Sequence, residues 1–456
     1  VFLSSALFPI PFTNLSGSTL DGYATANHII QVNKFNPAEF SQTNVASNFY
    51  NPYAEQWSMR WQREIGHNQV LEARYVGTHG VGLFATENGN PYINNLVNGF
   101  SADGFTFPGF GTKFTDGAVP VTNGAIPQGD GREFDENLVR TRDNVAQSIY
   151  HSLQVRYQAR VFNQLSVGAN YTFSKALDNA SEIFAFTETP VASDPFDLKN
   201  ERGYSGFDRP NAMSINFIWD IPIYRNQEGV LGHLAGGWQL NGVYQLADGQ
   251  RYTPNEQFSF YNGLSYGDFS WDANFIGNIQ AQRPFVINNS APASSVAVTS
   301  EDAVLLGFAL PKGIRVSDNV FLSMNALNAT GTAKVVPLNS VRFLVNGPAA
   351  ADFMGNPFGD ATRNSLQGPI VNNLNLGLFK NIRLRESMTL QLRLEAFNAL
   401  NHPDEGPGSI LFNGTLTPDT FVEDAGKTAL GSGFANNGNS YILSNRVVQV
   451  GVKMIF

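Results

Sequence analysis

The chain contains no cysteine, which excludes disulfide frameworks, thiolate zinc sites and thiol chemistry within this sequence. Charged residues are also scarce, at 15% of all residues, whereas typical soluble domains have roughly 25%. The net charge of −9 argues against a nucleic-acid partner, because nucleic-acid binding depends on a basic surface. The chain therefore has no thiol-based chemistry, and a nucleic-acid partner is not expected.

Long apolar runs are missing as well. No segment approaches the roughly 18 consecutive apolar residues of a transmembrane helix, which excludes a helical membrane protein. Apolar residues nevertheless make up 42% of the chain, and Phe (36) outnumbers Lys and Arg together (29). This composition is typical of a membrane β-barrel with neutral polar loops, and equally of a secreted all-β protein. No signal peptide is visible, and the first residue is Val1 and not Met, so we expect a mature or truncated product.

Apolar and polar side chains alternate along several segments, with the two-residue period of a strand. In the clearest segment, apolar residues such as Leu153 and Val155 alternate with polar residues such as Arg156. Most of these segments have the length of about ten residues that a tilted membrane-spanning strand needs. The nine expected strands are 56–65, 71–75, 152–161, 165–174, 213–223, 238–246, 374–384, 388–395 and 446–456.

The connections between these segments alternate between short and long. Short connections lie at 66–68, 163–164 and 385–387 and after Ile223, and the long ones are expected at 78–147, 175–208, 251–369 and 401–440. Strict alternation places all long loops on one side, as in outer-membrane barrels with short periplasmic turns and long extracellular loops. The sequence therefore predicts an all-β fold, an antiparallel transmembrane β-barrel formed by residues 51–456. Residues 1–50 are predicted to be an extracellular loop or an N-terminal remnant.

An odd number of strands conflicts with antiparallel closure, because the first and last strands then run in the same direction. Bacterial single-chain barrels have an even number of strands. Either a strand near 27–34 is missing from the count, or the chain is part of a larger barrel, and we expect the second.

The chain ends on a strand whose apolar residues share one face with a terminal aromatic residue. These residues are Val448, Val450, Val452, Met454 and Phe456. The segment resembles the C-terminal signal by which barrel-assembly machinery recognises outer-membrane proteins. An ordinary edge strand that ends a soluble β domain is the alternative. We expect the bacterial outer membrane as the location and its lipid as a partner.

Two groups of residues are candidates for function. Charged residues on the polar side of the strands are expected to line the barrel lumen: Arg60, Glu72, Arg74, Arg156, Arg160, Arg393 and Glu395. Their structural alternative is a set of cross-strand charge pairs that stabilise the barrel. Aromatic loop residues are expected to hold a ligand at the mouth, or to pack the loops together: Tyr204, Phe207, Tyr261, Tyr266, Phe269 and Trp271.

The sequence shows no recognisable catalytic motif. The six histidines do not pair at metal-ligand spacing, and no Gly-x-Ser-x-Gly elbow occurs. We therefore expect a protein that is not an enzyme and uses no cofactor or metal.

Several motifs carry a resemblance that extends from Asn51 to Phe456. They include Asn51-Pro52-Tyr53-Ala54-Glu55-Gln56-Trp57, Tyr171-Thr172-Phe173-Ser174-Lys175-Ala176-Leu177-Asp178-Asn179-Ala180-Ser181, Glu201-Arg202-Gly203-Tyr204-Ser205, Phe207-Asp208-Arg209-Pro210, Gly237-Trp238-Gln239-Leu240, Arg363-Asn364-Ser365-Leu366-Gln367-Gly368-Pro369 and Glu395-Ala396-Phe397-Asn398-Ala399-Leu400-Asn401-His402-Pro403. Together they resemble the C-terminal part of the barrel in TonB-dependent outer-membrane receptors of the acidobacterial Oar-like family, whose members carry a carboxypeptidase-regulatory-like domain.

The resemblance implies a barrel of about 22 strands in total, whose lumen holds a plug. The implied partners are an N-terminal plug and the remaining strands of the parent protein, TonB acting through that plug, and an unknown small ligand. The implied function is energy-coupled import of a scarce solute such as a siderophore, an oligosaccharide or a peptide. A structural or adhesive surface protein, assembled through its loops or strand edges, is the alternative from another class.

Overall fold

The computed structural model describes residues 42–88, 93–102, 105–114, 139–162, 164–181, 192–249, 251–254, 283–292, 295–305, 308–323, 334–367, 370–385, 388–402, 404–405, 441–443 and 445–455. Within them, no helix has both the length and the apolar character needed to cross a membrane.

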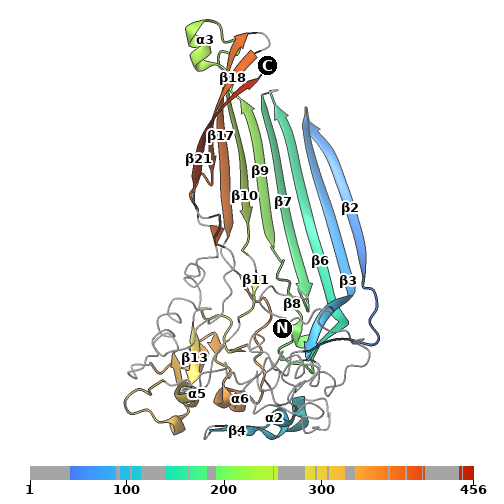
Figure 1. Ribbon diagram of the computed structural model, residues 1–456, viewed down its shortest axis with the longest axis vertical. Coiled ribbons are helices and arrows are strands. Elements are labelled where there is room, and N and C mark those ends of the chain that lie inside the picture. Colours follow the sequence, from blue (N-terminus) through green and yellow to red (C-terminus); the bar gives the residue numbers. More distant parts are fainter. Residues whose placement is uncertain are drawn as a thin grey trace, which may run out of the picture.

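A tall antiparallel sheet dominates the fold (Figure 1). Its nine long strands follow one another in chain order across the sheet: β2 (Tyr53–Gly66), β3 (Gln69–Asn88), β6 (Val139–Val161), β7 (Leu165–Asp178), β9 (Asn211–Asp220), β10 (Trp238–Ala247), β17 (Val371–Arg385), β18 (Met388–Phe397) and β21 (Val447–Ile455). Two short strands join the sheet beside them. β1 (Gln42–Val45) runs parallel to the start of β6, and β8 (Gly203–Tyr204) pairs with the end of β7.

The expected strand positions are confirmed, but several boundaries differ. β3 continues to Asn88 and β6 begins at Val139, so parts of the predicted loop 78–147 are strand. These extensions pair with each other, for example at Glu87 and Thr141, where the apolar alternation that guided the prediction has faded. β9 ends at Asp220, earlier than expected. Pro222 follows shortly afterwards and has no N–H to donate to a ladder.

The connections separate to the two ends of the sheet. Short connections join β2 to β3, β6 to β7 and β17 to β18 at one end, where α3 (Gly229–Ala235) also lies (Figure 1). The long connections between β3 and β6, β7 and β9, β10 and β17, and β18 and β21 leave the opposite end. We name these the short-turn end and the loop end.

The register gives the sheet two chemically different faces, because residues directly opposite in an antiparallel pair point to the same side. Ala73 opposes both Trp61 and Val155. Leu394 opposes both Leu378 and Val450. The apolar rows of all nine strands therefore share one side, which we call the apolar face. The alternate residues, mostly polar, form the polar face.

The apolar face is widely exposed. Met59 is 75% exposed, Val450 78% and Val452 69%. Exposed apolar surface on this scale is unfavourable in water and marks a surface that another apolar phase covers. The buried apolar core lies elsewhere, at the loop end.

The sheet is open in the described part of the chain. β2 pairs only with β3, and β21 pairs only with β18. The two outer strands do not pair with each other, so these residues form an arc of antiparallel sheet and no closed barrel. This agrees with the expectation that nine strands cannot close among themselves.

The long connection between β10 and β17 was predicted as a loop at 251–369, and its described residues instead contain a small folded unit. β12 (Phe285–Val286), β15 (Phe343–Leu344), β13 (Val296–Thr299) and β14 (Phe321–Ser323) form a four-stranded sheet in that order. Helices α5 (Ser300–Leu305) and α6 (Pro348–Met354) contact β13. Phe285, Leu322 and Leu344 are fully buried there. We call this unit, residues 283–367, the loop domain.

Shorter elements complete the loop end. They are α2 (Ile93–Asn98), β4 (Phe100–Ala102), β5 (Phe105–Phe107), β11 (Arg251–Tyr252), β16 (Leu366–Gln367), β19 (Asp404–Glu405), β20 (Tyr441–Leu443) and the 3-10 helices Gly111–Phe114, Leu198–Glu201, Val316–Asp318 and Leu338–Ser340. β11 pairs with β16, which ties the two ends of the long connection together.

A buried carboxyl group organises the loop domain. Asp302 is fully buried, and its carboxyl oxygens accept hydrogen bonds from the backbone N–H groups of Ala349 and Ala350, both at 3.0 Å. The hydroxyl of Thr299 donates a further bond at 2.9 Å. Asp302 thus caps the first turn of α6, whose own N-cap residue, Gly347, has no side chain to do so.

We predict that Asp302 makes the loop domain more stable at acidic pH. Burial raises the pKa of Asp302 to about 7, above its ordinary value of 3.8. The folded state therefore holds this proton more tightly than the unfolded state, and stability falls as pH rises between these two values. The slope is at most roughly 1.4 kcal/mol per pH unit. Thermal unfolding of the loop domain at pH 5 and pH 7.5 measures it, and Asp302→Asn is expected to flatten the dependence. An unchanged dependence in Asp302→Asn would show that other groups cause it.

Candidate functional site at the loop end

Three motifs that lie far apart in the sequence meet at the loop end of the sheet. The first ends β7 and includes Asp178 and Ser181, the second contains Glu201 and Tyr204, and the third contains Arg363 and Asn364. Gly203 makes the approach possible, because a Cβ atom there would lie 2.3 Å from the carbonyl oxygen of Arg363. The motifs therefore fasten the loop domain to the sheet.

Arg363 is the centre of this cluster. Its guanidinium forms an ion pair with Asp178 and donates to the hydroxyl of Ser181 at 2.9 Å. It also donates to the backbone carbonyl oxygens of Asp178 at 2.7 Å and Glu201 at 3.0 Å. Both charged side chains are largely buried, at 12% and 5% exposure. A buried pair of this kind is costly to break, because the remaining charge loses its partner away from water.

A second ion pair lies beside the first. Arg251 donates from Nε to a carboxylate oxygen of Asp208 at 3.1 Å, and its guanidinium lies 4.0 Å from the ring centroid of Tyr204. The other oxygen of Asp208 accepts from the backbone N–H of Ala176 at 2.7 Å. The carboxylate thereby links β7, the Phe-Asp-Arg-Pro motif and β11.

A third ion pair connects the loop domain to the connection between β7 and β9. Arg283 donates to Glu201 at 2.6 Å, and each side chain is 6% exposed. The other carboxylate oxygen of Glu201 accepts from the backbone N–H of Ser193 at 3.0 Å.

A polar cavity of about 910 Å³ opens beside this third pair. Its charges are balanced, with cationic Lys113, Lys199, Arg202 and Arg283 and acidic Asp194, Asp197, Glu201 and Asp360. Phe114, Phe196 and Phe358 provide apolar walls. Two buried lining atoms, Ser193 Oγ and Arg283 Nε, have no hydrogen-bond partner among the described residues. Unsatisfied buried polar atoms are unusual in folded proteins, so these two leave hydrogen-bonding capacity in the wall of the cavity.

Two acids that line this cavity, Asp194 and Asp360, have raised pKa values. Burial raises the pKa of Asp194 to about 6, although backbone N–H groups of Phe196 and Asp197 oppose the change. Burial also raises the pKa of Asp360. Near pH 6 the Asp194 carboxyl group changes between hydrogen-bond acceptor and donor, so this wall of the cavity can match hydroxyl, amide or carboxyl groups of a bound molecule.

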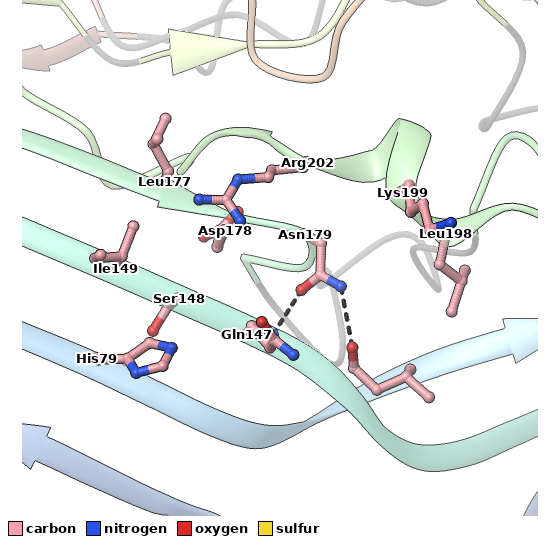
Figure 2. A pocket seen from close by; sticks show the side chains of 11 residues that line it. His79, Gln147, Ser148, Ile149, Leu177, Asp178, Asn179, Leu198, Lys199 and Arg202 are labelled. Carbon is pink, nitrogen blue, oxygen red and sulfur yellow. Dashed lines mark hydrogen bonds between the residues drawn. The ribbon is translucent and has the colours of Figure 1, made fainter.

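A smaller cavity of about 320 Å³ lies between β3, β6, β7 and the residues before β8 (Figure 2). Asn179 accepts from the backbone N–H of Gln147 at 2.6 Å and donates to the carbonyl oxygen of Val145 at 3.0 Å. His79, Ser148 and Arg202 also line it. The hydrogen bonds of Asn179 join the end of β7 to β6, which indicates that they stabilise this end of the sheet.

The charged residues predicted to line a lumen all lie on the polar face. Arg60 pairs with Glu72 at 3.0 Å. Arg393 lies 5.0 Å from the ring centroid of Phe379, and Glu395 accepts from Gln449 at 2.7 Å. For Arg60, Glu72, Arg393 and Glu395, these contacts fit the alternative that such residues stabilise the sheet. Arg74, Arg156 and Arg160 are exposed on the same face.

The six aromatic loop residues that were predicted to hold a ligand lie in three kinds of position. Tyr204 is half-buried under Arg251 and belongs to the fastening cluster. Phe207 is 65% exposed at the loop end. The remaining four, Tyr261, Tyr266, Phe269 and Trp271, lie outside the described residues. None of the six lines the larger cavity within the described part of the chain.

The terminal stripe has the predicted form. Val448, Val450, Val452 and Met454 lie on the apolar face of β21, opposite Ala396, Leu394, Leu392 and Leu390. Phe456 lies outside the described residues. Among the residues that the structure describes, no group of three or more His, Asp or Glu side chains is placed to hold a metal ion.

Sequence reasoning missed the arginines that organise the site: Arg251, Arg283 and Arg363. A signal existed for Arg363, which begins one of the motifs that carry the family resemblance. Its partner Asp178 lies 185 positions earlier in the chain, and no local pattern connects the two.

The comparisons with known proteins bear on this geometry. The family model described as an outer membrane beta barrel domain matches residues 6–419. Among solved structures, the outer membrane transporter YddB from Escherichia coli matches with a TM-score of 0.37 and 9% sequence identity, covering 91% of this chain and 34% of that chain. The chain thus spans about a third of the length of that transporter. No curated protein matches the sequence.

Proposed function

Because this chain belongs to the outer membrane beta-barrel domain family, we propose that it forms part of the wall and mouth of a TonB-dependent receptor of the Oar-like kind. The protein lies in the bacterial outer membrane. The proposed receptor imports a scarce solute with energy from the inner membrane, and it makes or breaks no covalent bond in that solute.

The division of the sheet into two faces is the observation that supports this function best. The apolar face offers lipid a continuous surface across all nine strands. The polar face offers an aqueous lumen a surface of amide, hydroxyl and charged groups. A transmembrane barrel alternates its residues in this way.

Closure of the barrel requires strands beyond the nine long ones in the described part of the chain. The outer edges of β2 and β21 would leave unpaired backbone N–H and C=O groups in hydrocarbon, at several kcal/mol each. We propose that further strands of the parent protein join these edges to make a barrel of about 22 strands. The plug of the parent would then occupy the lumen and transmit the action of TonB.

The larger cavity is the proposed first binding site for the solute. It lies at the loop end, which general barrel topology assigns to the cell exterior. Balanced charge, phenylalanine walls and unsatisfied buried polar atoms favour a polar solute with hydroxyl or amide groups, such as an oligosaccharide or a peptide. A siderophore remains within the same proposal.

We predict that filling the cavity weakens solute binding. Asn200 lines the cavity and is exposed, so Asn200→Trp should obstruct it without disturbing the buried ion pairs. The full-length protein in nanodiscs would be screened by thermal shift with panels of oligosaccharides, peptides and ferric siderophores. We expect affinity for the solute found to fall at least about tenfold in Asn200→Trp, equal to about 1.4 kcal/mol.

Lys312→Trp is the control, because Lys312 is exposed on the loop domain and does not line the cavity. Unchanged binding by Asn200→Trp would contradict the cavity assignment. Uptake of the same solute in cells lacking TonB tests the coupling separately, and undiminished uptake there would contradict a TonB-dependent receptor.

The unpaired edges of β2 and β21 also suit a surface protein that assembles through strand edges. The two functions differ in a simple observation on the full-length protein. A receptor closes its own barrel around a plug, whereas an adhesive protein joins β2 or β21 to a strand of another molecule.

A further inference from the structure

Helix α3 presents an apolar surface at the short-turn end. Val230 is 78% exposed, Leu231 69% and Leu234 66%. Their spacing places them on one side of the helix, and Gly232 faces inward and is buried. Such a surface on a short connection needs a partner that covers it.

The helix is held firmly at its C-terminal end. The ammonium group of Lys380 donates to the carbonyl oxygens of Leu234, at 3.1 Å, and of Gly236. The indole N–H of Trp238 donates to the same oxygen of Leu234 at 3.2 Å. A cation at a helix C-terminus satisfies otherwise free carbonyl groups and the helix dipole.

The turn before the helix is also built into the sheet. The buried side chain of Gln227 donates to the carbonyl oxygen of Asn381 at 2.8 Å and accepts from the N–H of Arg383 at 3.1 Å. At Gly236, a Cβ atom would lie 2.1 Å from the carbonyl oxygen of Tyr224, so only glycine fits. The orientation of α3 is therefore fixed by the sheet.

The attachment points place the helix on the lipid side. Trp238 and Lys380 oppose each other in the register, in the same rows as Leu240 and Leu378. These rows belong to the apolar face, and the Lys380 ammonium lies 5.1 Å from the Trp238 ring centroid. The side chains that hold the C-terminal end of α3 thus belong to the surface that faces the bilayer.

We propose that α3 is an interfacial helix that lies on the bilayer at the short-turn rim. Val230, Leu231 and Leu234 enter the boundary between headgroups and acyl chains, where amphipathic helices bind. Trp238 sits at the level of the aromatic belt, and Lys380 keeps its charge paired with the carbonyl groups of the helix. The proposal rests on the outer-membrane location and is independent of the solute.

Single-cysteine labelling tests this proposal, because the chain has no cysteine of its own. Leu231→Cys and Leu234→Cys, each carrying an NBD fluorophore, would be examined in the full-length protein in vesicles of phosphatidylethanolamine and phosphatidylglycerol. Val450→Cys on the apolar face is the lipid reference, and Asn226→Cys in the exposed turn is the aqueous reference. Heat modifiability of each variant confirms that the barrel has folded.

We expect labels at positions 231 and 234 to emit at shorter wavelength than the label at 226, and to be quenched by doxyl lipids and not by iodide. Quenching by iodide as strong as at 226 would place α3 in water and overturn the proposal. Protection from both quenchers would show that protein covers the helix, which overturns it equally.

Discussion

Replacing Arg363 with alanine is expected to release the loop domain from the sheet while the long strands remain paired. The substitution leaves the carboxylate of Asp178 buried without its ion pair and removes the donors to Ser181 and Glu201. Losing one partner of a buried pair costs about 3–5 kcal/mol. Hydrogen exchange of the loop domain, measured beside that of β7 and β9, reports the release.

Arg202→Ala is the matched control, because Arg202 is an exposed arginine that directly follows Glu201, a residue contacted by Arg363. Its exchange should equal that of the wild type. The double variant Asp178→Asn/Arg363→Ala should lose less stability than Arg363→Ala alone, because no unpaired charge then remains buried. Wild-type protection of the loop domain in Arg363→Ala would contradict the fastening role.

Ile215→Arg is expected to destabilise the barrel in the membrane by about 2–4 kcal/mol, the cost of an arginine at the bilayer midplane. Ile215 lies near the middle of β9 on the apolar face, between Ala169 and Tyr244. Loss of the heat-modifiable form and a lower urea midpoint in vesicles measure the change.

Asn216→Arg provides the control at the next position of the same strand. Asn216 lies on the polar face, opposite Gly168 and Val243, and its side chain is exposed. We expect it to assemble like the wild type. Equal damage from the two substitutions would mean that the faces are wrongly assigned.

The strands could be predicted from the sequence because their signal is local. A membrane-spanning strand exposes one side to lipid and the other to water, so a two-residue period is imposed along its whole length. In 152–161 the period is unbroken, and β6 passes through all of these residues. In 78–88 the two-residue period fades, because this part of β3 extends beyond the apolar rows. The sequence therefore did not predict this extension of β3.

The loop domain could not be predicted in the same way. Its core joins Phe285, Leu322 and Leu344 from short strands separated by long connections. Strands of two to four residues are too short to show a period. Their structure depends on tertiary burial, which a local pattern does not reveal.

The candidate site, too, could be predicted only where a local sequence pattern exists. The rows that contain Arg60, Glu72 and Arg393 were assigned to one face from the sequence, and the register places them there. The pairing of Asp178 with Arg363 could not be predicted without the fold, because the two residues lie 185 positions apart in the sequence. Helix α3 was missed since a seven-residue segment with two glycines has little helical signal.

The separation of a lipid-facing apolar face from an aqueous polar face is tested most directly by cysteine scanning along β9. Positions 213–218 of the full-length protein would be changed singly to cysteine and reacted in intact outer membranes with a water-soluble maleimide. We predict reaction at 214, 216 and 218, on the polar face, and protection at 213, 215 and 217, on the apolar face. Reaction without a two-residue period, or reaction at the odd positions alone, would contradict this arrangement.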